Sequence, residues 1–142
     1  MRYSDLIQLY FERSTALQWY WTLYVVVIGG LLAFSSLRVR QDPLTAALVT
    51  VLFCLFAYKN LGAIHDTTVQ RLAVLQAIRQ VSAAAPETSD AGQVAKILDP
   101  TLVVPGYEGV RNFHVVSDLL TIAAVWAMER RRMRKAQNQV DE

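Results

Sequence analysis

Three apolar runs dominate the pattern of hydrophobic and polar positions along the chain. The first carries no charge from Ser14 to Leu37, which exceeds the roughly 20 residues that a helix needs to cross a bilayer core. We therefore predict a transmembrane helix over residues 17–37. The residues before it also have helical spacing, and we expect them to lie at the membrane interface or to continue straight into this helix.

The second run predicts a transmembrane helix over residues 44–64. Asp42 and Pro43 precede it, where an N-cap residue and a first-turn proline are favoured. Lys59 interrupts the run, but it lies near enough to the predicted helix end for its ammonium group to reach the headgroup layer. Since only a few residues separate the first two runs, they must form a tight antiparallel hairpin.

After the second run the helical pattern continues over residues 66–84 but becomes amphipathic. No helix breaker intervenes, so we expect one long second helix that leaves the bilayer and extends into water. Leu72 and Leu75 lie off the apolar stripe, which predicts a second apolar contact with a sister subunit or another partner. The stripe itself consists of Val74, Ile78, Val81 and Ala85.

Prolines and glycines then mark a connector over residues 85–111. Within it only the segment SDAGQVAKIL is typical of a short capped helix. Connectors of this length are uncommon in compact domains and are often functional.

The third run, residues 112–128, contains Asp118, which leaves two interpretations open: a transmembrane helix or an amphipathic helix on the membrane surface. An aspartate at mid-bilayer costs about 2.5 to 3.5 kcal/mol, and each large apolar residue returns about 0.3 to 0.6 kcal/mol, so insertion is near break-even. We favour a transmembrane helix, because Asp118 lies near its start. Lys59 is expected at the same depth, and the two side chains form an intramembrane ion pair or reach separately for water.

With three spans, the N-terminus and the connector share one side of the membrane, and the hairpin and the C-terminal tail share the other. Basic residues in short segments next to a span favour the cytoplasmic side. We therefore expect the N-terminus outside and the C-terminus inside a cell membrane, of the bacterial inner-membrane kind. The basic cluster of the tail, residues 129–142, is then a topology signal or an electrostatic anchor to anionic lipids. It consists of Arg130, Arg131, Arg132, Arg134 and Lys135.

Composition agrees with membrane residence, since the 142 residues are 54% hydrophobic and only 18% charged. The formal net charge of +2 is too small to indicate nucleic-acid binding. A single cysteine, Cys54, excludes an intramolecular disulfide and a cysteine zinc site.

His65 and His114 are the two histidines of the chain, and both are expected near the outer membrane face. Two neutral imidazoles with Asp66 nearby suit a metal ion or the two axial positions of a haem. Ordinary interfacial histidines at helix ends explain the same pattern. The first interpretation is therefore that the two histidines bind neither a metal ion nor a haem.

Small residues recur at helical spacing in the first two spans and favour close helix approach within the chain or between chains. They are Gly29, Ala33, Ala46, Thr50 and Cys54. No catalytic motif occurs in the sequence, which argues against a hydrolase or a nucleotide enzyme.

These patterns predict an all-α polytopic membrane protein of a single domain with three transmembrane helices. Its leading functional interpretation is a self-assembling protein or an accessory subunit of a membrane complex. A pore former is the first alternative, because three short spans and a basic tail resemble holin-like architecture, although the long outer segment departs from it. A haem- or metal-binding subunit that uses His65 and His114 is the second alternative.

Overall fold

The computed structural model describes residues 2–86 and 89–138, and helices account for most of them. The elements are α1 (Tyr3–Leu37), α2 (Pro43–Ala84), α3 (Asp90–Leu98), the 3₁₀ helix η1 (Asp99–Thr101) and α4 (Tyr107–Asn138). No strand occurs in these ranges, so the predicted all-α class is confirmed for the part of the chain described.

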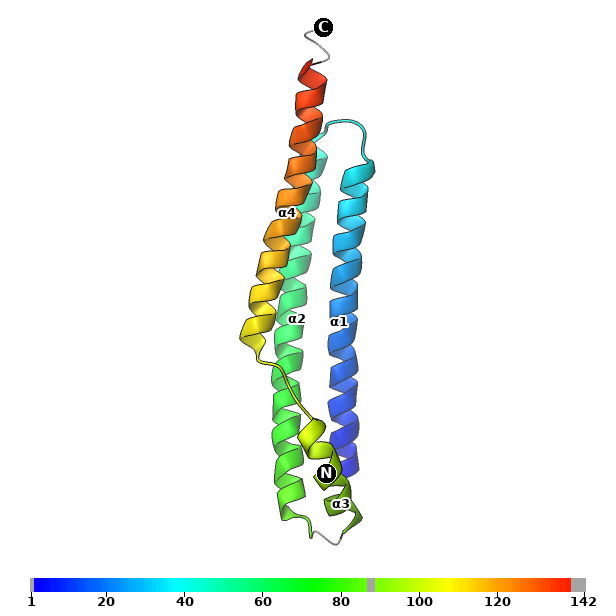
Figure 1. The fold of residues 1–142 in the computed structure, drawn as a ribbon, viewed down its shortest axis with the longest axis vertical. Coiled ribbons are helices and arrows are strands. Elements are labelled where there is room, and N and C mark those ends of the chain that lie inside the picture. Colours follow the sequence, from blue (N-terminus) through cyan, green and yellow to red (C-terminus); the bar gives the residue numbers. More distant parts are fainter. Residues whose placement is uncertain (1, 87–88, 139–142) are drawn as a thin grey trace.

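The long helices α1, α2 and α4 lie side by side with alternating direction (Figure 1). The N-terminus and α3 lie at one end of the bundle, and the α1–α2 connection and the C-terminal part of α4 lie at the other. At 1.5 Å per residue, α1, α2 and α4 are about 52, 63 and 48 Å long, respectively. We call the end that contains α3 the arm, and the opposite end the hairpin end.

Local sequence explains where the first two long helices begin. The Asp5 carboxylate accepts a hydrogen bond from the Arg2 backbone N–H, 3.1 Å away, at the start of α1. The N-terminal residues continue straight into the apolar run, which is one of the two arrangements expected for them. Asp42 caps α2 by accepting from the Thr45 N–H at 3.1 Å, and α2 then runs unbroken to Ala84. The predicted long second helix is therefore present.

The connector also follows its sequence signals in part. Ser89 caps α3 by accepting a hydrogen bond from the Gly92 N–H at 3.1 Å, so the short capped helix is confirmed. In contrast, α4 begins before residue 112 and ends after residue 128. Residues 129–138 are helical because arginine, lysine, alanine and glutamine are strong helix formers.

Two hydrophobic clusters hold the bundle together. In the arm, Leu75 and Ile78 of α2 pack against the first turns of α1 and against the connector, with Tyr3, Leu6, Tyr10, Ala95 and Leu102. Leu75 is thus covered within the chain, and the sister subunit expected to cover it is not needed there. Leu72 remains exposed. The second cluster joins Leu31, Phe53 and Val125 of the three long helices.

In the described part of the chain, α1 and α2 are long and apolar enough to cross a membrane. Only 11% and 22% of the residues in their most apolar windows are buried inside the protein, whereas the core helix of a soluble protein is mostly buried. α4 does not meet the same criterion, because Asp118 and the flanking charges shorten its apolar stretch. The predicted third transmembrane helix is therefore not confirmed by apolarity alone.

Candidate functional site

A chain of polar side chains crosses the interior of the bundle and contains one residue from each of α1 and α2 and two from α4. The Tyr24 hydroxyl donates to Asp118 Oδ1 at 2.8 Å and also lies 3.2 Å from the His114 carbonyl oxygen. His114 Nδ1 lies 2.9 Å from Asp118 Oδ2, and His114 Nε2 lies 3.3 Å from Asn60 Nδ2. This polar chain, Tyr24–Asp118–His114–Asn60, links all three long helices.

The partners of His114 define its hydrogen-bonding state. Asn60 Nδ2 is a donor, so His114 Nε2 must accept from it. In this arrangement Nδ1–H donates to the Asp118 carboxylate. Each donor atom in the polar chain has at least one partner, as is usual for buried polar groups.

Helical spacing and ring packing position these groups. His114 and Asp118 are four residues apart and therefore lie on the same face of α4. The imidazole of His114 is 0% exposed and packs against the Tyr24 ring, with ring centroids 4.0 Å apart. The Asp118 side chain is 18% exposed and borders a small pocket of about 210 Å³ between α2 and α4.

The opposite face of α4 carries exposed apolar side chains. They are Phe113, Val115, Val116, Leu119 and Leu120. Around His114 and Asp118, α4 is therefore polar where it meets α1 and α2 and apolar where it meets its surroundings, the reverse of a helix on the surface of a soluble protein; further along, Val125 returns to an apolar contact between the helices.

The predicted ion pair between Lys59 and Asp118 is not formed. Lys59 is exposed on α2, and the described residues include no salt bridge between the two. Asp118 instead turns into the bundle toward Tyr24 and His114. Lys59 and its neighbour Asn60 point in different directions because successive residues on a helix differ by about 100°.

The two histidines lie in different environments. His65 is exposed, lies 3.2 Å from Asp66 Oδ1 through its Nδ1, and packs edge-on against Tyr107 with ring centroids 4.6 Å apart. His114 is fully buried, and both of its ring nitrogens have protein partners. Among the described residues, no group of three or more His, Cys, Asp or Glu side chains is placed to hold a metal ion.

A second polar cluster lies at the hairpin end and centres on Glu129 of α4, which is 1% exposed. Glu129 Oε1 accepts from the Asp42 N–H at 2.6 Å, and Oε2 lies 3.1 Å from Arg132 Nη1. Arg132 also donates to the carbonyl oxygens of Arg38, at 2.8 Å, and Ser35. This hairpin clamp joins the end of α1, the start of α2 and α4.

Asp42 belongs to the same cluster as the α2 N-cap. Its carboxylate accepts from the side-chain hydroxyl and backbone N–H of Thr45. These hydrogen bonds, chiefly that of the hydroxyl, hold the pKa of Asp42 below its ordinary value of 3.8, and the nearby Arg38 lowers it further.

A third polar cluster ties the connector to the arm. Arg71 Nη2 lies 3.0 Å from the Tyr10 hydroxyl, which donates to the Val103 carbonyl oxygen at 3.2 Å. The Arg71 guanidinium also lies over the Tyr10 ring, 5.0 Å from its centroid. Arg71 Nε is buried with no hydrogen-bond partner among the described residues.

Next to it, the Tyr3 hydroxyl donates to Asp99 Oδ1 at 3.0 Å, and Ser82 donates to Asp99 Oδ2 at 2.6 Å. Burial raises the pKa of Tyr3 to about 12, and the hydrogen bond and negative charge of Asp99 act in the same direction. Asp99 therefore holds the first turn of α1 to the end of α2.

Most of the small residues of the first two apolar runs are exposed rather than packed between helices of this chain. Gly29, Ala33 and Cys54 are exposed, and only Ala46 is buried. Thr50 donates to the carbonyl oxygen of Ala46 at 2.8 Å, which is a bond within α2 rather than between helices. A side chain added at Gly29 would meet nothing within 4 Å.

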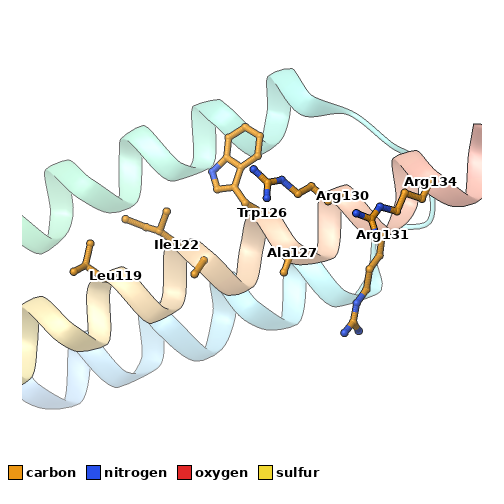
Figure 2. A pocket seen from close by; sticks show the side chains of 8 residues that line it. Leu119, Ile122, Trp126, Ala127, Arg130, Arg131 and Arg134 are labelled. Carbon is orange, nitrogen blue, oxygen red and sulfur yellow. The ribbon is translucent and has the colours of Figure 1, made fainter.

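The basic cluster of the tail divides into two groups. Arg132 is half-buried in the hairpin clamp, whereas the other members are exposed. Arg130, Arg131 and Arg134 stand at one end of a furrow along α4 whose other residues include Trp126 (Figure 2).

Sequence reasoning missed Tyr24, Asn60 and Glu129 in the first two clusters, and it did not predict the third cluster. Tyr24 and Asn60 could have been found from the sequence, because each is a polar residue inside an apolar run, and such residues often form interhelical hydrogen bonds. Glu129 directly precedes the basic cluster, but the sequence gives no sign that it is buried.

Comparisons of the chain with protein-family models, with curated proteins and with solved structures find no match.

Proposed function

We propose that this chain is an integral membrane protein in which α1, α2 and α4 all cross the bilayer. One observation carries the proposal: exposed apolar side chains cover all three helices over residues 19–58 and 113–120. On α1 and α2 they include Leu23, Val26, Leu48, Leu52 and Leu55. A contiguous apolar surface of this extent marks a membrane or protein contact.

The position of Asp118 supports α4 as the third span. An isolated α4 would expose this carboxylate to lipid, at a cost of up to about 3 kcal/mol. Within the bundle, Tyr24 and His114 satisfy it, and polar groups in transmembrane helices typically face the bundle interior in this way. α4 thus inserts as a partner of α1 and α2, which explains why its own apolarity falls short.

The charge distribution supports an orientation with the hairpin end in the cytoplasm. In the sequence, the hairpin connection and the tail carry four acidic residues, Asp42, Glu129, Asp141 and Glu142, against seven basic residues. The basic residues are Arg38, Arg40, Arg130, Arg131, Arg132, Arg134 and Lys135. The N-terminus and the arm then lie outside, with α2 extending well beyond a hydrocarbon core of about 30 Å.

For function, we favour a self-assembling membrane scaffold over an accessory subunit of another complex. Gly29 and Ala33 are one helical turn apart on α1 and remain exposed after the bundle has formed, which permits close approach of a second copy. The arm adds exposed apolar side chains outside the bilayer, including Phe11, Val69 and Leu72. Both surfaces suit contacts between copies.

The observations do not favour the two alternatives. A pore needs a polar outer face that an oligomer can turn toward a water-filled channel, but Asp118 and His114 face the interior of their own bundle. A haem needs a free imidazole nitrogen, and both nitrogens of His114 have protein partners.

Native mass spectrometry of the detergent-solubilised protein tests self-assembly. We expect one defined oligomer of the full chain, and we expect Gly29→Leu to reduce it to monomer because leucine blocks the close approach. The matched control is Gly62→Leu, since Gly62 is also exposed with open space around it. A wild-type monomer, or an oligomer that Gly29→Leu leaves intact, would contradict this assignment.

A further inference from the structure

The hairpin end contains a pocket of about 850 Å³ between the α1–α2 connection and α4. Arg38 and Arg40 line it from the connection, and Arg131, Arg132 and Lys135 line it from α4. Pockets of this volume are typical of small-molecule binding sites. Its cations come from segments more than 90 residues apart in the sequence, so the fold itself assembles the positive charge.

The cations of this pocket have different roles. Arg132 and Arg38 are committed to protein partners: Arg132 to Glu129 and two backbone carbonyls, and Arg38 to the Asp42 carbonyl oxygen at 3.0 Å. Arg40, Arg131 and Lys135 are exposed, and none of them has a salt bridge or side-chain hydrogen bond with the described residues. The first pair fixes the shape of the pocket, and the other three cations are available to an anion.

The neighbouring furrow on α4 indicates what kind of anion fits. Arg131 also borders this second hollow, of about 530 Å³, which has Leu119, Ile122 and Trp126 along its length and the further cations Arg130 and Arg134 at its basic end. Figure 2 shows these apolar side chains following α4 away from the arginines, while Arg131 points to the side of the bundle on which α1 ends. The cationic pocket and the apolar furrow are separate hollows that share Arg131, and together they are complementary to an amphiphile with an anionic head and an acyl tail.

We propose that this site binds an anionic phospholipid, with its phosphate at Arg40, Arg131 and Lys135 and an acyl chain along the furrow of Trp126. The inference rests on the proposed membrane residence and adds a specific ligand to it. Basic pockets next to transmembrane helices on the cytoplasmic side are a recognised way of binding anionic headgroups. A soluble phosphate would use the cations but not the furrow, and this difference separates the two ligands.

Tryptophan quenching by brominated lipids tests the site in the full chain. In Trp19→Phe/Trp21→Phe, Trp126 is the sole tryptophan of the chain, and in Trp21→Phe/Trp126→Phe, Trp19 takes that place at the other membrane face. Both variants are reconstituted in phosphatidylcholine vesicles that contain a minor fraction of brominated phosphatidylglycerol or of brominated phosphatidylcholine. We expect brominated phosphatidylglycerol to quench Trp126 at least threefold more effectively than brominated phosphatidylcholine, and to show no such preference at Trp19.

Charge variants identify the cations. Each basic residue near an anionic surface contributes on the order of a fivefold gain in binding. We expect Arg40→Gln/Arg131→Gln/Lys135→Gln to abolish the preference at Trp126. The matched control, Arg13→Gln/Arg79→Gln/Lys96→Gln, removes the same charge from exposed positions elsewhere and should retain it.

Each outcome of these experiments bears on the claim. Equal quenching of Trp126 by the two lipids, or a preference that survives the pocket variant, would overturn the lipid site while leaving membrane residence intact. A preference that glycerol phosphate removes by competition would assign the pocket to a soluble anion instead. Absence of quenching of both tryptophans by both lipids would overturn membrane residence and the lipid site together.

Discussion

Replacement of Asp118 by leucine should change the membrane insertion of α4 and the stability of the folded bundle in opposite directions. On an insertion scale the change favours membrane entry of α4 by at most about 3 kcal/mol, because a carboxylate is removed and an apolar residue added; the gain is smaller near the start of the span, where Asp118 lies. In the structure, however, the same change removes the acceptor of the Tyr24 hydroxyl at 2.8 Å and of His114 Nδ1 at 2.9 Å. We therefore predict that Asp118→Leu inserts better than the wild type and yet has a less stable bundle.

The expected magnitude follows from the groups left behind. Tyr24 keeps a second acceptor, the His114 carbonyl oxygen, so its loss is small. The Nδ1–H of the fully buried His114 keeps none, and an unsatisfied buried donor costs about 1 to 3 kcal/mol. Interhelical hydrogen bonds in membranes average about 0.6 kcal/mol and reach about 1.7. We expect the free energy of unfolding in mixed micelles to fall by about 2 kcal/mol.

Reversible SDS unfolding in mixed micelles measures this change. Trp21 reports the separation of α4 because its ring lies 6.1 Å from His114 and 6.0 Å from Phe113, centroid to centroid. The measurement uses Trp19→Phe/Trp126→Phe as background. Ala123→Leu is the control, since it adds the same side chain at an exposed position of α4 and should leave stability within about 0.5 kcal/mol.

A double-mutant cycle with His114→Leu isolates the pair. We predict a coupling free energy of about 1 to 2 kcal/mol between His114 and Asp118. A coupling below about 0.3 kcal/mol, or an Asp118→Leu protein more stable than the wild type, would refute the role assigned to the polar chain.

Three further predictions concern the other polar clusters. Glu129→Ala should raise the hydrogen-exchange rate of the Asp42 amide at least tenfold, because Glu129 Oε1 is the acceptor of that amide. An unchanged rate would contradict the hairpin clamp. Tyr3 should ionise near pH 12 rather than 10 in ultraviolet titrations compared with Tyr3→Phe, and Asp99→Asn should lower that midpoint. Since the folded arm retains a proton that the unfolded chain loses above pH 10, arm stability should fall as the pH rises from 10 to 12, and a constant stability there would contradict this. For Asp42, whose pKa is lowered, the hairpin stability that it contributes should be present above pH 3.8 and disappear as the pH falls below it; Thr45→Val should weaken that dependence, measured by exchange at the hairpin.

The sequence predicted the helices well because their signals are local. Asp42 and Pro43 start α2, Ser89 starts α3, and the absence of a breaker keeps α2 continuous to Ala84. α4 extends beyond the predicted span of residues 112–128 at both ends, because that prediction followed apolarity, whereas the backbone stays helical through polar residues.

The polar sites were predicted less well because they depend on rotation of each helix about its axis. The sequence predicted Lys59 at the same membrane depth as Asp118. Contact also requires that the two side chains point toward each other, and Asn60 rather than Lys59 faces α4. The two histidines do not form a shared site for the same reason, because His65 faces outward and His114 faces inward. Packing of three helices sets these rotations, and the pattern of a single helix does not contain them.

The measurement that tests the central claim most directly is the number of membrane crossings. In a Cys54→Ser background, single cysteines replace Ser4, Gln41, Lys96 or Gln137, all of which are exposed, and intact cells are labelled with a membrane-impermeant maleimide. Three crossings with the hairpin end inside predict labelling of Ser4→Cys and Lys96→Cys in intact cells, and labelling of Gln41→Cys and Gln137→Cys only after permeabilisation. Labelling of Lys96→Cys and Gln137→Cys from the same side would show that α4 does not cross the membrane and would contradict the account.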